Sequence, residues 1–170
     1  MSKFTVLLLL LLATTSGMTF AKELSKAEVE HFLKLEFWDF DQTATGWRKL
    51  TSNKDTTSED RLAAANLCRL YFERRKDVPT SKLAIVAFHA GQNFAFANRS
   101  KEALAVFEKS FQQNKPDWNA YVKGTIAFLN QDRSELIRQR AILARIPGQM
   151  NLEVLDRLIK NFDKPYAIAY

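Results

Sequence analysis

The feature that most constrains this fold is the recurrence of apolar residues at helical spacing along most of the chain. One stripe falls on a single face of an amphipathic helix and consists of Ala103, Leu104, Phe107 and Phe111. No stretch alternates apolar and polar residues over the length of a strand. The sequence therefore predicts an all-α protein.

Capping residues and prolines divide the chain into about six or seven helices. Ser25 and Glu28 form a capping-box pattern that opens a helix over residues 25–37. Residues 39–46 hold few helix formers and predict a turn, after which Trp47 opens a short helix. Pro116 suits the first position of a helix. The helical segments are short enough to pack as antiparallel neighbours.

The amino terminus has the layout of a secretory signal peptide. Lys3 supplies a positive charge, residues 6–13 form an apolar run, and Thr19 and Ala21 provide the small residues of a cleavage site. The run is far shorter than the roughly 20 residues that span a bilayer, and no later stretch could serve as an integral membrane segment. We expect cleavage after Ala21, so that the protein is exported, either periplasmic or secreted.

The spacing of large and small residues indicates a repeat. Phe94 and Phe128 lie 34 residues apart, and prolines at 79, 116 and 147 punctuate the chain. The central unit carries Ala90, Gly91, Phe94, Ala103, Phe107 and Pro116. This pattern resembles the tetratricopeptide repeat, although Pro116 falls one residue late and the outer units lack parts of the pattern.

The resemblance implies a short stack of antiparallel helix hairpins in one domain, residues 22–170, after a cleaved signal peptide, residues 1–21. The expected units span about 44–79, 84–116 and 118–147, with flanking helices at 25–37 and 150–161.

In tetratricopeptide-like proteins the first helices of successive units line a concave groove that binds a protein or peptide segment. Aligning the sequence with the repeat pattern assigns this role to Arg48, Phe88, Gln92, Phe96, Asn119, Val122 and Ile126. Amide and guanidinium donors among them could pair with a peptide backbone. The alternative is that Phe88 and Phe96 belong to the core, because large apolar residues are usually buried.

A second class of function would place a pocket around Asp39, Asp41, Arg48 and His89, as in a small-ligand-binding protein or a hydrolytic enzyme. A catalytic histidine needs a nucleophile and an orienting partner, and no serine or cysteine lies at a neighbouring helical position. Acidic residues in a turn are more often caps or local ion pairs. The sequence favours a structural or hydrogen-bonding role for His89.

Composition excludes several further classes of site. Two histidines and one cysteine do not make a zinc site, and no phosphate-binding glycine loop is present, so we expect neither a metal nor a cofactor. The chain has a net charge of +6, but its basic residues alternate with acidic ones and do not form a cluster. This pattern argues against nucleic acid as a partner. The leading hypothesis is an exported interaction module without catalytic activity, acting as an adaptor, a scaffold or a partner-neutralising protein.

Overall fold

The computed structural model describes residues 23–149 and 151–170, so the predicted signal peptide lies outside the described residues. Within that part of the chain the regular structure is helical without strands, which confirms the all-α prediction. The elements are α1 (Lys26–Leu33), η1 (Trp38–Gln42), η2 (Trp47–Leu50), α2 (Ser58–Arg74), α3 (Thr80–Phe96), α4 (Ser100–Phe107), α5 (Pro116–Leu129), α6 (Arg133–Leu143), α7 (Leu152–Lys160) and α8 (Tyr166–Ala169). None of these described helices is long and apolar enough to cross a bilayer.

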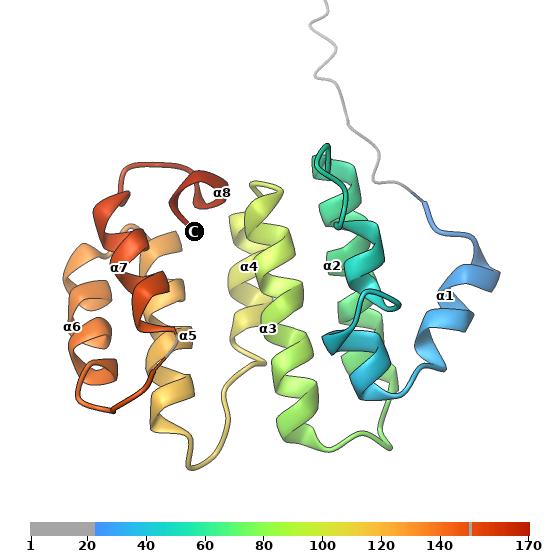
Figure 1. Cartoon of the computed structure of the whole chain (residues 1–170), viewed down its shortest axis with the longest axis horizontal. Coiled ribbons are helices and arrows are strands. Elements are labelled where there is room, and N and C mark those ends of the chain that lie inside the picture. The colour runs from blue at the N-terminus through green and yellow to red at the C-terminus, as the bar shows by residue number, and fades with distance from the viewer. Residues whose placement is uncertain (1–22, 150) are drawn as a thin grey trace, which may run out of the picture.

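The helices stand side by side in a row, from α1 at one end to α6 and α7 at the other (Figure 1). The tightest neighbours are α2 with α3, α5 with α6, and α3 with α4. The chain reverses direction between α3 and α4 and again between α5 and α6, which makes two antiparallel hairpins. α7 packs on α5 and α6, and the short α8 returns to contact α3. A stack of helix hairpins is therefore the observed architecture.

Helix starts follow the capping residues that the sequence indicates. Ser25 and Glu28 form a complete capping box at α1, and Thr57 with Asp60 forms another at α2. Asp132 caps α6 by accepting from the backbone N–H of Glu135. The Glu135 carboxylate accepts from Arg138 and Gln139 instead of returning to Asp132, so only half of a capping box forms at α6.

Both hairpins end their first helix with the same left-handed turn, which corrects the predicted register. Asn98 and Gln131 each have φ of 58°, and in each case a backbone N–H reaches back five residues, from Arg99 to Phe94 and from Asp132 to Ala127. Phe94 therefore corresponds to Ala127, and the structural offset is 33 residues. The assumed equivalence of Phe94 with Phe128 was wrong by one residue.

Two helix ends and one additional helix also differ from expectation. The first helix ends at Leu33 rather than near residue 37, and a short π-helix, η1, extends into the expected turn. α4 ends at Phe107, so Phe111 packs half-buried beyond the helix. The aromatic tail forms α8, which the sequence did not predict.

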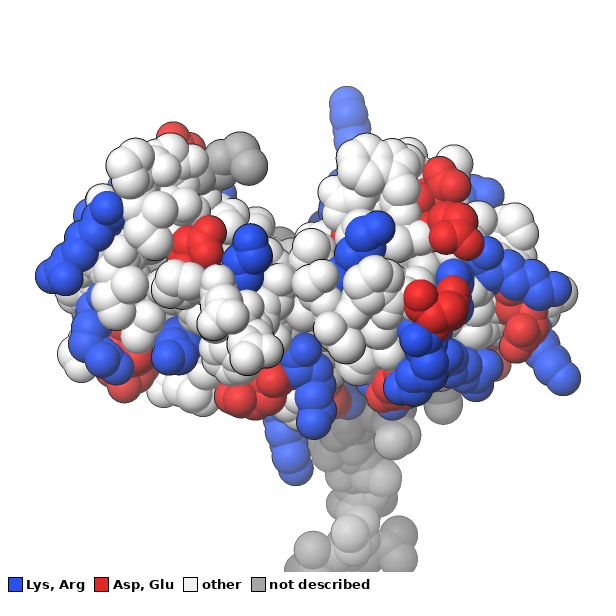
Figure 2. All heavy atoms as spheres, turned by 90° about the horizontal axis from the view of Figure 1, so that it is seen from below, with Lys and Arg blue, Asp and Glu red and all other residues white. Residues whose placement is uncertain are grey.

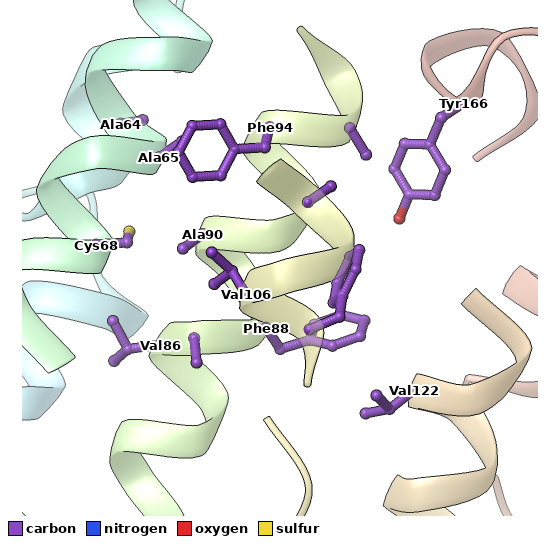
Figure 3. Close-up of a cluster of buried hydrophobic side chains, with 14 of the residues drawn as sticks. Ala64, Ala65, Cys68, Val86, Phe88, Ala90, Phe94, Val106, Val122 and Tyr166 are labelled. Atoms are coloured by element: carbon purple, nitrogen blue, oxygen red, sulfur yellow. The ribbon is translucent and has the colours of Figure 1, made fainter. Parts of the chain in front are cut away.

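The core lies between neighbouring helices and combines small residues with aromatic rings. Ala64, Ala65 and Cys68 of α2 face Ala90 and Phe94 of α3 (Figure 3). Between the two hairpins, the Phe88 ring centroid lies 4.9–5.1 Å from those of Phe107, Trp118 and Tyr121. Small side chains allow α2 and α3 to approach closely, while the aromatic rings fill the wider space beyond α3.

Gly91 provides a test of this packing because it lets the ring of Phe107 lie against α3. A Cβ at position 91 would lie 2.7 Å from two ring carbons of Phe107, whose side chain is fully buried. We expect Gly91→Ala to lower the free energy of unfolding by roughly 1–3 kcal/mol through overpacking, as measured by urea denaturation.

The matched control is Gly124→Ala, because Gly124 occupies the equivalent place in the second hairpin. A Cβ there would meet the terminal methyl groups of Leu155, which can rotate away. We expect a cost below about 1 kcal/mol, offset in part by the better helix propensity of alanine. Equal costs at the two positions would contradict the tight α3–α4 contact.

Candidate functional site

A buried carboxylate, that of Asp41, organises the best-defined polar cluster. Its side chain is completely inaccessible to solvent. Oδ1 lies 2.7 Å from Nδ1 of His89 and accepts a hydrogen bond of 3.0 Å from Nε1 of Trp47. Oδ2 accepts from Nε2 of Gln42 at 2.5 Å. A buried charge needs such partners, since a carboxylate without them is strongly disfavoured in a protein interior.

The η1–η2 turn brings these partners together. Gly46 packs directly against the backbone of Phe40, and a Cβ there would overlap the Phe40 carbonyl oxygen, so only glycine fits. The hydroxyl of Thr43 donates to the carbonyl of Asp39 and helps to close the turn. Arg48 then reaches back, and its Nε donates to the Asp41 carbonyl at 2.8 Å. The turn thus places Asp41, Trp47 and Arg48 beside α3.

His89 projects from α3 into this cluster and keeps 17% of its side chain exposed. Burial by itself would raise the pKa of Asp41, but the hydrogen bond and charge of His89, helped by Trp47 and Arg48, lower it below its usual value. An ionised carboxylate only accepts hydrogen bonds, so Nδ1 of His89 is the donor. The opposite nitrogen, Nε2, has no partner among the described residues and faces the solvent.

The cluster continues along α3 toward its carboxyl end. Nδ2 of Asn93 donates to the His89 carbonyl at 2.9 Å, and Arg61 of α2 donates to Oδ1 of Asn93 at 3.3 Å. The Arg61 guanidinium lies 4.6 Å from the centroid of the Phe96 ring, and the Arg48 guanidinium lies 4.4 Å from that of Trp47. We call Arg48, Arg61, His89, Asn93 and Phe96 the α3 strip.

The α3 strip carries two cations that form no salt bridge with the described residues, although the Arg48 charge acts on Asp41 from a distance. Neither Arg48 nor Arg61 forms an ion pair among residues 23–149 and 151–170. Burial lowers the pKa of Arg61, which is the expected sign for a guanidinium that has lost water without gaining an anion. The strip therefore has unused capacity to bind acceptors.

The predicted groove residues do not share one surface. Phe88 and Val122 are buried in the core, and Gln92 is only 8% exposed. Arg48 and Phe96 lie on the α3 strip. The side chain of Asn119 exchanges two hydrogen bonds with the backbone of Gln112, so it fastens the loop before α5. Ile126 instead lines a hollow of about 510 Å³ bordered by α5, α6 and the segment that follows α4.

The register explains this scatter. The predicted groove residues of the second hairpin lie 34 positions after those of the first. The equivalent backbone positions of the two hairpins are 33 residues apart. One residue turns a helix by about 100°. The true equivalents of Phe88 and Gln92 are Tyr121 and Thr125, which are both buried. The second hairpin thus presents different side chains from those that the resemblance implies.

The second set of candidate residues is brought together in part. Asp41, Arg48 and His89 converge, as described above. Asp39 does not join them, because its side chain is exposed and only its carbonyl takes part in the turn. The thiol of Cys68 is fully buried, and burial raises its pKa well above the usual value, so it does not supply a thiolate. Among the described residues, no three potential ligands gather around a metal site.

Several residues of the site were not predicted from the sequence. Arg61 gave no local signal, because its partner Asn93 lies 32 residues along the chain in α3. The indole of Trp47 bonds Asp41 six residues away across the η1–η2 turn, a contact that no periodic pattern predicts. The four-residue spacing of His89 and Asn93 on one helix face was the available hint.

The chain matches no protein-family model, and comparison with curated proteins and with solved structures gave no significant match. The fold thus defines the class, an all-α stack of helix hairpins, while its tetratricopeptide resemblance stays a prediction.

The lowered pKa of Asp41 predicts a pH-dependent contribution to stability. A carboxylate with a depressed pKa stabilises the fold above its unfolded value, near pH 4, and loses this contribution as the pH falls through the folded value. We expect Asp41→Asn to reduce the free energy of unfolding by about 1.5–3 kcal/mol near neutral pH, the range for a hydrogen bond to a charged group. The deficit should shrink below about pH 4.

Urea denaturation across this pH range measures the effect, and Asp39→Asn is the matched control. Because the Asp39 side chain is exposed, its replacement should change stability by less than about 0.5 kcal/mol at any pH. A deficit for Asp41→Asn that stays constant down to about pH 2 would contradict an ionised, buried carboxylate.

Proposed function

We propose that the protein is an exported, tetratricopeptide-like interaction module without catalytic activity. It binds a segment of a protein or peptide along the α3 strip, and serves as an adaptor, a scaffold or a protein that neutralises its partner. Export rests on the signal-peptide pattern of residues 1–21 and gives a periplasmic or secreted location.

The observation that carries this proposal is that the guanidinium groups of Arg48 and Arg61 form no salt bridge within the described part of the chain. Each stacks on an aromatic ring, which holds the cation in place and lowers the entropy lost on binding. Their free N–H groups suit carboxylates and main-chain carbonyls of an extended segment. His89 lies between them, with its ring beside that of Trp47 and its carbonyl bonded by Asn93, and in its neutral form it offers Nε2 as an acceptor beside these donors.

The arrangement of the helices in a row is suited to binding a partner protein or peptide. A row of helices buries its core between neighbours and leaves long faces free. On the face shown in Figure 2, basic and acidic side chains are interspersed, and the outline is hollowed between the α5–α7 end and the α1–α2 end. Because this face lacks a field of one sign, the proposal does not include nucleic acid among the partners.

The test compares partner capture by the full exported protein with that by charge-neutral variants. We expect Arg48→Gln and Arg61→Gln each to weaken binding of the principal partner about tenfold or more, the loss of one charge-assisted hydrogen bond. Affinity purification from the source envelope or medium with mass spectrometry identifies the partner, and calorimetry with that partner measures the affinity.

Arg145→Gln is the matched control, because Arg145 is exposed beyond α6 and far along the chain from the α3 strip. It should bind as the wild type does. Capture of the same partner with equal affinity by all three variants would rule out the α3 strip as the binding surface.

A second candidate function is small-ligand binding or hydrolysis at Asp41, Arg48 and His89. It is favoured by the orientation of His89, since a histidine held by a buried carboxylate with Nε2 open is the arrangement of a general base. The two candidates respond differently to substitution. For the second, His89→Gln removes small-molecule binding or turnover while Arg61→Gln leaves it intact.

A further inference from the structure

The short helix α8 lies where the end of α3 faces α5, and the rings of Tyr166 at its start and Tyr170 directly after it insert there. The Tyr166 centroid is 5.1 Å from that of Phe96 and 5.9 Å from that of Phe128. The Tyr170 ring lies 5.4 Å from Phe96, and its hydroxyl is 2.9 Å from the hydroxyl of Tyr121. Figure 3 shows Tyr166 pointing from α8 toward the core cluster that contains Phe88 and Val122. α8 therefore adjoins the α3 strip at Phe96.

This contact has the form of a bound helical ligand. α8 has four residues, far fewer than a helix needs to be stable by itself. The two tyrosines are one helical turn apart and face inward, whereas Ile168 on the outer side is 66% exposed. Two aromatic anchors on one helix face are the usual means by which a helix binds a groove.

One polar atom shows that α8 fits this place imperfectly. The Tyr166 side chain is 3% exposed, and its hydroxyl is the one buried side-chain polar atom of the described residues without a hydrogen-bond partner. Burial, followed by the nearby Tyr170, raises the pKa of Tyr166 well above its usual value, while the adjacent side-chain amide of Gln92 lowers it. Because that amide lies outside hydrogen-bond geometry, the buried hydroxyl has lost water without a full replacement, which weakens the docking of α8.

We propose that α8 occupies in cis the binding place of a partner helix that carries two aromatic side chains four residues apart. Such a helix displaces α8, fills the space against Phe96, Tyr121 and Phe128, and pairs a polar group with Gln92. Release of α8 returns the Tyr166 hydroxyl to water, which favours the exchange. This proposal rests on the proposed function, because it extends the α3 strip and identifies the kind of partner.

The probe is a labelled synthetic peptide with the sequence of residues 163–170, added to the full-length chain. We expect the double variant Tyr166→Ala/Tyr170→Ala, whose own α8 lacks both anchors, to bind the peptide at least about tenfold more tightly than the wild type, the effect of removing an internal competitor. A peptide with alanine at both tyrosine positions is the control and should not bind. Circular dichroism first establishes that the variant is folded. A folded variant that does not bind the tyrosine peptide would overturn the proposal.

Hydrogen exchange on the wild type provides a test that needs no variant. The α8 amides of Ile168, Ala169 and Tyr170, which bond within that segment, should exchange at least about a hundredfold faster than those in the middle of α3, because α8 opens locally. Exchange of α8 at the rate of the α3 core would show that it is a fixed part of the core and would contradict the proposal.

The two proposals fail separately. If the peptide binds but no partner depends on Arg48 and Arg61, the displacement of α8 is supported and the interaction module is contradicted. A partner that depends on those arginines, without peptide binding, would support the module and exclude the displacement of α8.

Discussion

The buried carboxylate of Asp41 is the interaction on which the candidate site depends. It joins three parts of the chain, because Gln42 lies in η1, Trp47 in η2 and His89 in α3. A buried carboxylate without these donors would be strongly disfavoured, so the amino-terminal turns dock on α3 in a single arrangement. That arrangement sets the orientation of His89 and puts Arg48 over the Trp47 ring.

α3 therefore has three roles on its different faces. One face packs small residues such as Ala90 against α2, and a second places Phe88 in the aromatic core with α4 and α5. The third holds His89, Asn93 and Phe96, whose partners come from the turns, α2 and α8. Since the same helix anchors the core and the strip, the polar side chains are held on a rigid support, as recognition with little ordering cost requires.

Local rules of sequence accounted for the helices and their starts, but long-range contacts decided the site. The cap at Ser25 depends on neighbouring residues and was predicted directly, and the caps at Thr57 and Asp132 obey the same local rule. The offset of 33 depends on left-handed turns at Asn98 and Gln131, residues that tolerate this conformation without requiring it. Asp41 and its partner His89 lie 48 residues apart, Arg61 and its partner Asn93 lie 32 apart, and α8 is too short to have its own periodic signal. Spacing alone could not place them.

The orientation of His89 tests the central claim most directly. An ionised Asp41 that accepts from Nδ1 fixes the neutral imidazole as the Nδ1–H tautomer, with Nε2 bare and facing the solvent. Long-range proton–nitrogen correlation NMR of the ¹⁵N-labelled protein at about pH 9, where imidazoles are normally neutral, distinguishes the two nitrogens. We predict a protonated Nδ1 and an unprotonated Nε2. A proton on Nε2, or rapid averaging of the two tautomers, would contradict the account.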